Sequence, residues 1–174
     1  IQNTCSWLPP YHDMGLIAGI FFPLYSGVAA LLIAPAFFLQ SPFRWLELIA
    51  KECVSTTYMP NFAFDYCVDK TTQEQVKELD LSSLKHAFNG AEPIHHQTAQ
   101  RFYEHFKTAK LASCALLTGY GLAENTLIAT GACDNQWATP LYLDKEALAK
   151  GLVQLHKEPS AQSAAFVSSG PTFP

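Results

Sequence analysis

Short apolar runs alternate with helix-like segments along most of this 174-residue chain. The apolar runs predict buried strands at residues 5–8, 28–34, 54–58, 84–88 and 115–117. The segments between them predict helices at residues 14–24, from Ser41-Pro42 onward, at residues 61–69 and at residues 95–106. Strands and helices in this order predict an α/β fold, in which a mostly parallel sheet has covering helices on both faces.

One uncharged segment is long enough to raise the question of a membrane span. Residues 15–40 contain no charged side chain and no histidine. Pro23 and Pro35 are expected to interrupt a helix here, and Tyr25-Ser26-Gly27 is typical of a turn. The segment therefore predicts a helix of about ten residues followed by a buried strand, each too short to cross a bilayer.

Composition excludes several other classes of protein. A hydrophobic content of 49% is enough for a substantial core, and a net charge of −4 argues against a nucleic-acid-binding surface. The five cysteines are scattered without a Cys-x-x-Cys pair, which favours reduced thiols in a cytoplasmic protein over disulfides or a zinc site. Neither a signal peptide nor a recognisable terminus is present, so we expect this chain to be part of a longer protein.

Two glycine-containing turns follow predicted strands. The first, Gly119-Tyr120-Gly121-Leu122-Ala123-Glu124, places an aromatic ring between two glycines and is predicted to open a helix over residues 122–129. Glycines let the backbone approach a phosphorylated ligand, Tyr120 can stack on a base, and Glu124 can bind a divalent cation. The second turn, Asn89-Gly90-Ala91-Glu92-Pro93, lies upstream. Because ligands bind at the carboxyl ends of parallel strands, the two turns are predicted to share a ligand. A purely structural Asx turn remains the alternative for Asn89-Gly90.

Two more motifs complete a recognisable series. Leu8-Pro9-Pro10-Tyr11-His12-Asp13-Met14-Gly15 follows the first strand, and Pro60-Asn61-Phe62-Ala63-Phe64-Asp65 follows a later one. In this order, the four motifs resemble those of the fatty acyl-AMP ligases, which belong to the superfamily of acyl-CoA synthetases, adenylation domains and luciferases. The likeness extends over residues 6–129. It implies that the chain is the second α/β subdomain of the N-terminal domain of an adenylate-forming enzyme.

The resemblance also implies a role for individual residues. Residues 89–93 would lie against one face of adenine, with Asn89 near its exocyclic amine and Tyr120 on the other face. The nucleotide-binding residues implied are Asn89, Gly90, Ala91, Glu92, Pro93, Gly119, Tyr120, Gly121, Leu122 and Ala123. Glu124 would bind Mg²⁺, and His12 would lie near the reacting carboxylate and the α-phosphate of ATP; these two are the implied catalytic residues. Asp13, Met14, Phe21, Asn61 and Phe62 would contact the acyl substrate.

Plain structural explanations compete with some of these roles. His12 opens a predicted helix and can simply satisfy first-turn hydrogen bonds. His95 and His96 resemble a metal-binding pair, but adjacent helical side chains point apart, so both are expected at the surface. The aromatic residues around Phe21 and Phe62 are expected to lie chiefly in the core, with some lining an acyl tunnel.

The function implied by the resemblance is activation of a medium- or long-chain fatty acid by ATP, with Mg²⁺. The product would be an acyl-adenylate, with release of pyrophosphate and transfer to an acyl carrier protein or a polyketide or non-ribosomal synthase. The family's phosphate loop, ribose-binding aspartate, hinge and C-terminal lysine have no counterpart in the sequence, so the chain alone is expected to be inactive. Two alternatives remain open, namely a fatty acyl-CoA synthetase and a non-catalytic α/β module that binds lipid or nucleotide.

Three domain segments are expected. Residues 1–135 would form the adenylation subdomain, and residues 161–174 would begin the following β subdomain. Residues 136–160 resemble an insertion that distinguishes acyl-AMP ligases and is thought to restrain the swing of the C-terminal domain. From its residues alone, this segment is only polar, with helical propensity.

Overall fold

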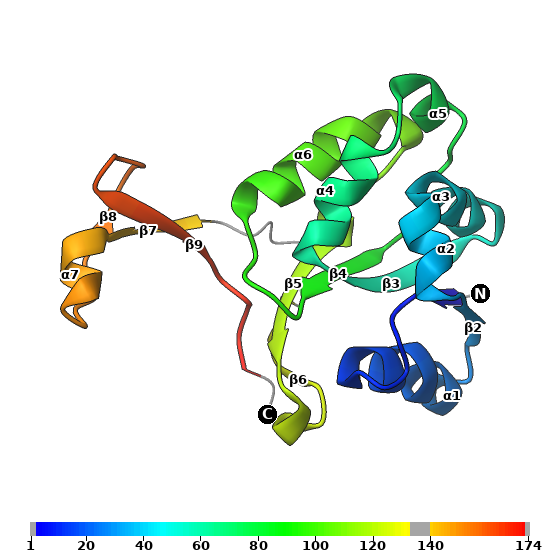
Figure 1. Cartoon of the computed structure of the whole chain (residues 1–174), viewed down its shortest axis with the longest axis horizontal. Coiled ribbons are helices and arrows are strands. Elements are labelled where there is room, and N and C mark those ends of the chain that lie inside the picture. The colour runs from blue at the N-terminus through cyan, green and yellow to red at the C-terminus, as the bar shows by residue number, and fades with distance from the viewer. Residues whose placement is uncertain (1–2, 133–139, 173–174) are drawn as a thin grey trace.

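A six-stranded sheet forms the centre of the molecule (Figure 1). The computed structural model describes residues 3–132 and 140–172. The strands are β1 (Asn3–Ser6), β2 (Ala29–Leu32), β3 (Val54–Pro60), β4 (His86–Gly90), β5 (Leu116–Gly121) and β6 (Ile128–Gly131). Their order is β2-β1-β3-β4-β5-β6, with parallel pairing from β2 to β5 and an antiparallel β6. The predicted mostly parallel α/β sheet is therefore confirmed.

Helices lie on both faces of this sheet. They are the π-helix η1 (Met14–Phe21), α1 (Phe22–Ser26), α2 (Pro35–Gln40), α3 (Pro42–Lys51), α4 (Asn61–Asp69), α5 (Gln73–Lys77) and α6 (His96–Phe106), with short 3-10 turns η2 (Lys107–Ala109), η3 (Ser113–Ala115) and η4 (Ala123–Asn125). Figure 1 shows α4 and α6 on one side of the sheet and α1 on the other. The main hydrophobic core lies under α3, α4 and α6, where Trp45, Phe64 and Phe102 are fully or almost fully buried.

The uncharged segment folds differently from the prediction. η1 and α1 follow each other directly, so Pro23 does not interrupt the helical stretch, and that prediction was wrong. The helix changes from π to α geometry at Phe22, so Pro23 lies in the first turn of α1, where the backbone N–H that proline lacks is not needed. Gly27 then ends α1 in the left-handed conformation, as the predicted turn requires. Pro35 begins the unpredicted helix α2. None of the helices in the described part of the chain is sufficiently long and apolar to cross a bilayer.

The segment after β5 also corrects the sequence prediction. In place of a helix over residues 122–129, the chain makes the short turn η4 and returns as β6. The Leu122 N–H donates to the Leu127 carbonyl oxygen at 2.8 Å, which closes a hairpin. Ile128 and Thr130 are β-branched and suit the returning strand. Helix α4 has the bounds predicted for it, whereas α5 was missed. Ser41 precedes α3, but its side chain makes no capping hydrogen bond.

A second, three-stranded sheet follows the first. It consists of β7 (Pro140–Asp144), β8 (Leu155–His156) and β9 (Ser163–Val167) in the order β8-β7-β9, with α7 (Lys145–Ala149) beside it. Asp144 Oδ1 accepts from the Ala147 N–H at 2.8 Å, and Oδ2 lies 3.1 Å from His156 Nε2. These two contacts, with that to Ala147 the larger, lower the pKa of Asp144. Strand β9 pairs with β7, so residues on either side of the expected boundary at residue 160 share one sheet. The first residues of the expected insertion, 136–139, lie outside the described residues, and the three domain limits stay a prediction.

Candidate active site

A cavity of about 730 Å³ is lined by residues along β1, β3 and β4 and includes the carboxyl ends of β4 and β5. Of the predicted site residues, the structure brings together His12, Asp13, Met14, Asn89, Gly90, Ala91, Gly119, Tyr120 and Gly121 in its lining. They come from the loop and helix after β1, from the end of β4 and from the end of β5. Segments far apart in the sequence thus meet at one edge of the sheet, as the topology requires.

The ends of β4 and β5 lie close to each other. Asn89 pairs with Thr118, and a Cβ atom added to Gly90 would lie 3.0 Å from the Gly119 carbonyl oxygen. Asn89 and Gly90 belong to β4 itself, and the chain turns only at Ala91, a non-glycine residue with φ of 66°. The Asn89 Oδ1 accepts no hydrogen bond from the described residues, so the alternative of an Asx turn at Asn89-Gly90 is not formed.

Asn89 offers an unsatisfied hydrogen-bond acceptor. Asn89 is 4% exposed, and its Nδ2 donates to Asn61 Oδ1 at 3.0 Å. Its Oδ1 is buried and has no hydrogen-bond partner among the described residues. A buried acceptor without a partner costs about 1–3 kcal/mol, which a donor on a bound ligand can offset. An exocyclic amine of a base is a donor of this kind, so Asn89 fits the adenine that the sequence motifs imply.

Gly121 is required by the hairpin rather than by a ligand. A Cβ atom at this position would lie 1.7 Å from the Leu127 carbonyl oxygen, whereas at Gly119 the nearest atom would be 3.5 Å away. The backbone of the hairpin, and not the cavity, thus demands glycine at position 121.

This difference predicts the outcome of a matched pair of substitutions. Gly121→Ala should destabilise the protein by about 1–3 kcal/mol, because the hairpin backbone has to move. Gly119→Ala, two residues earlier on the same strand, should cost much less. Chemical denaturation of both variants provides the measurement, and equal losses of stability would contradict this account of Gly121.

His12 and Asp13 form a pair at the mouth of η1. His12 Nδ1 lies 2.6 Å from Asp13 Oδ1, and the Met14 N–H donates to the same carboxylate oxygen at 2.7 Å. The Met14 N–H also lies 3.2 Å from His12 Nδ1, which cannot both accept there and donate to Asp13. We assign the proton to Nδ1, because its contact with the Asp13 carboxylate is shorter than its contact with the Met14 N–H, and a carboxylate is a strong acceptor. Nε2 then remains available on a side chain that is 52% exposed and lines the cavity. The hydrogen bond to the first turn that was considered for His12 is thus made mainly by Asp13, which accepts from the Met14 N–H.

Glu124 stands in the short turn η4, beside two residues that line the cavity, Asn125 and Thr126. Its side chain is exposed. Thr126 has φ of 66°, which is uncommon for a β-branched residue and marks a constrained turn. Among residues 3–132 and 140–172, no group of three or more His, Cys, Asp or Glu side chains could hold a metal ion. A single exposed carboxylate fits Mg²⁺ that takes its other ligands from phosphates and water.

The floor of the cavity was missed by the sequence analysis. Tyr58 and Phe88 stack with ring centroids 5.4 Å apart, and Thr56 Oγ1 lies 3.2 Å from His86 Nδ1. Burial raises the pKa of Tyr58 to about 12, so its hydroxyl stays neutral. These four residues alternate along β3 and β4, opposite the side chains of Met59 and Ala87 in the main core. That alternation was the signal available in the sequence. The other lining residues that were missed are Thr4, Ile17, Ala18, Val28, Ser55, Asn125, Thr126, Leu127 and Ile128, whereas Phe22 belongs to the aromatic stretch that was expected in part to line an acyl tunnel.

The remaining predicted residues lie outside the cavity lining, namely Phe21, Asn61, Phe62, Glu92, Pro93, Leu122, Ala123 and Glu124. Phe21 is 51% exposed and Phe62 is 46% exposed, so the core position expected for these two residues was wrong. The Phe62 ring packs edge-on against Trp7, with centroids 6.3 Å apart. The Glu92 carboxylate accepts from the Phe62 N–H at 2.5 Å, at the start of α4. His95 is exposed, in agreement with the surface position expected for it.

Comparison with known proteins identifies the family. Residues 2–149 match the family model described as AMP-binding enzyme. The chain is 39% identical over 148 residues to the medium-chain-fatty-acid–[acyl-carrier-protein] ligase TtuA of Teredinibacter turnerae, covering 85% of this chain and 23% of that protein. It is 37% identical to the long-chain-fatty-acid–AMP ligase FadD26 of Mycobacterium marinum, covering 99% of this chain and 30% of that protein.

A solved structure gives the same result. The fatty acyl-adenylate ligase from L. pneumophila, in complex with acyl adenylate and pyrophosphate, superposes with a TM-score of 0.92 at 42% identity. The match covers 98% of this chain and 30% of that one, so the chain spans less than a third of the length of each of these three proteins. The chain belongs to the AMP-binding enzyme family, and within it resembles the fatty acyl-AMP ligases in sequence and in structure.

Proposed function

We propose that the protein containing this chain activates a medium- or long-chain fatty acid with ATP. The carboxylate attacks the α-phosphate of ATP, the bond between the α- and β-phosphates breaks, and acyl-adenylate and pyrophosphate are formed. The observation that carries this proposal is that residues from the first part of each nucleotide motif meet His12 and an apolar wall in one cavity. The names of TtuA and FadD26 and the acyl adenylate in the L. pneumophila structure support the same substrate class.

The end of β4 and the end of β5 would hold the base. Tyr120 is 56% exposed and lines the cavity, so its ring is available for stacking. Asn89 Oδ1 would accept from the exocyclic amine of adenine, which would satisfy its buried lone pairs. These two contacts would orient the nucleotide without taking part in bond making.

The opposite wall suits a hydrocarbon chain. Ile17, Ala18 and Phe22 from η1 and α1 line the cavity together with Val28 and Phe88. A hydrocarbon tail gains about 0.8 kcal/mol for each CH₂ group that it buries against such a wall. The carboxylate end of the acid would then lie towards His12, whose Nε2 would donate to it when protonated.

Positioning and charge stabilisation carry most of this chemistry, because two anions have to meet in line. Glu124 would hold Mg²⁺ beside the phosphates, and this ion supplies the positive charge that offsets theirs. His12 would orient the carboxylate, and Asp13 would hold the imidazole ring of His12 in place through the 2.6 Å contact.

We further propose that the acyl group passes to an acyl carrier protein or to a polyketide or non-ribosomal synthase in the cytoplasm. The carrier protein in the name of TtuA and the cysteines of this chain, of which Cys5, Cys53, Cys67 and Cys114 are free thiols, support this step and this compartment. In this proposal, residues 136–160 act as the insertion that restrains the swing of the C-terminal domain, between an adenylation subdomain and a β subdomain.

Pyrophosphate exchange into ATP tests the proposal on the complete protein. Exchange should depend on added fatty acid, and chromatography of products from labelled fatty acid, ATP and CoA should show acyl-adenylate without efficient acyl-CoA formation. Efficient acyl-CoA formation would replace the proposal by the acyl-CoA synthetase alternative. Absence of exchange with any fatty acid would leave the non-catalytic binding module in its place.

A further inference from the structure

The first residue of α4 connects the nucleotide turn to the interior of the protein. Asn61 is 4% exposed, and its Oδ1 accepts from Asn89 Nδ2 at 3.0 Å and from the His95 N–H at 3.1 Å. Asn89 begins the segment 89–93 that was predicted to cover adenine, and His95 lies two residues after the end of that segment. Between them, the Glu92 carboxylate accepts from the Phe62 N–H, so a third hydrogen bond holds the segment to the start of α4.

The orientation of the Asn61 amide follows from its partners. Asp65 Oδ2 can only accept, so the hydroxyl proton of Thr98 is donated to it, at 2.7 Å. Thr98 Oγ1 therefore accepts from Asn61 Nδ2, at 3.2 Å. The His95 N–H can only donate, which independently places Asn61 Oδ1 on the side of the nucleotide turn.

The same logic extends to the cavity. Because Asn61 presents an oxygen, Asn89 has to present its Nδ2 in return. The Asn89 oxygen is thereby left without a protein partner. A series of hydrogen bonds thus connects the Asp65 carboxylate on α4 to Asn89 in the lining of the cavity. In each of these bonds, the partners determine which group donates and which accepts.

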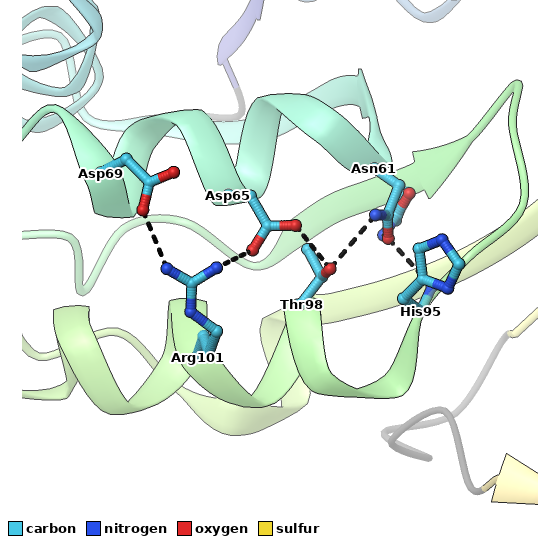
Figure 2. A network of polar contacts seen from close by, with 7 residues as sticks. Asn61, Asp65, Asp69, His95, Thr98 and Arg101 are labelled. Carbon is cyan, nitrogen blue, oxygen red and sulfur yellow. Dashed lines mark hydrogen bonds and ion pairs between the residues drawn. The ribbon is translucent and has the colours of Figure 1, made fainter. Parts of the chain in front are cut away.

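Ion pairs hold Asp65, the residue at which this series of hydrogen bonds ends on the side away from the cavity. Figure 2 shows Asn61, Asp65 and Asp69 along α4, facing Thr98 and Arg101 of α6. Arg101 Nη1 lies 2.5 Å from Asp65 Oδ1, and Nη2 lies 2.8 Å from Asp69 Oδ1. The contact with Asp69 is the largest of those that raise the pKa of Arg101. These exposed pairs hold α4 and α6 together without contacting the cavity.

We propose that Asn61 is a positioning residue for the nucleotide, which fixes the Asn89 amide so that its oxygen faces a donor on the base. The inference rests on the proposed function, and it assigns Asn61 to base selection rather than to the acyl contact first expected for it. It predicts that Asn61 and Thr98 determine how strongly the enzyme prefers ATP, which has an exocyclic amine, over inosine triphosphate, which has a carbonyl oxygen in its place.

The test compares two variants with a control in the complete protein, using pyrophosphate exchange with ATP and with inosine triphosphate. Asn61→Leu keeps approximately the same volume but removes the acceptor, so Asn89 is free to rotate. We expect the KM for ATP to rise about tenfold and the preference for ATP to fall by about the same factor. The kcat at saturating ATP and the KM for the fatty acid should stay nearly unchanged. Thr98→Val removes the hydrogen bond from Asn61 Nδ2 to Thr98, while the His95 N–H still donates to Asn61 Oδ1. The preference for ATP should therefore fall in this variant too, but by less than in Asn61→Leu.

Arg101→Gln is the matched control, because it removes both ion pairs and leaves Thr98, Asn61 and Asn89 in place. It should lower stability without changing the preference for ATP. If the wild type is active and the preference for ATP is unchanged in the folded variants, the inference is overturned while the proposed function stands. Should Asn61→Leu fail to fold, the preference measured with Thr98→Val decides in the same way. A wild type without fatty-acid-dependent exchange would overturn the proposed function and this inference together.

Discussion

Glu124→Gln should lower the rate of adenylate formation about 100-fold or more, because a cation that supplies several kcal/mol of charge stabilisation would be bound weakly. Glutamine keeps the shape of the side chain and removes only its negative charge. Glu124 is exposed in the turn η4, so the substitution removes no packing from the core. Folding stability should therefore change little while catalysis falls.

The measurement is pyrophosphate exchange over a range of Mg²⁺ concentrations, with thermal unfolding measured in parallel. Part of the lost activity should return at high Mg²⁺, since mass action compensates for weaker binding. Glu146→Gln is a suitable control, because it removes an exposed carboxylate from α7, away from the cavity lining. If Glu124→Gln exchanges pyrophosphate normally at low Mg²⁺, Glu124 does not bind the ion.

Tyr120→Ala should weaken nucleotide binding by about 1–3 kcal/mol, the range found for stacking of a base on an aromatic ring. This loss corresponds to a decrease in affinity of about 5- to 150-fold. Tyr120 is 56% exposed at the cavity, so little of the folded core depends on its ring. The fatty acid should bind as before, because the apolar wall comes from η1, α1 and β4.

Calorimetry with ATP and the complete protein provides the measurement. Tyr120→Phe keeps the ring and should bind ATP nearly as the wild type does, whereas a loss in that variant would point to the hydroxyl. Tyr25→Ala removes a tyrosine that is 94% exposed and outside the cavity lining, and should have no effect. Unchanged affinity in Tyr120→Ala would refute the assignment of Tyr120 to the base.

Local patterns in the sequence predicted the secondary structure correctly where one side of an element is buried in the core. The bounds of α4 match the prediction because Ala63, Phe64 and Cys67 bury one side of a helix with no internal helix breaker. The parallel strands were recognisable because short runs with apolar or β-branched residues alternate with helical segments along the chain, although β2 is largely exposed and not buried as predicted. Predictions failed where a distant contact decided the local conformation, as at Pro23 beside a π-helical turn and after Gly121, where the hairpin prevails over a helix.

The sequence by itself determined the family, the five parallel strands and their order along the chain, and the motifs that reach the carboxyl edge of the sheet. These properties depend on side-chain periodicity and on residue types within short segments. Only the tertiary structure decided which atoms each of these residues contacts there. It showed that Gly121 closely approaches Leu127 in the hairpin, and that Asn61 accepts a hydrogen bond from the amide of Asn89. The physical reason is that a hydrogen bond has a direction set by both partners, and the partners of Asn61 lie on β4 and α6, which meet only in the folded chain.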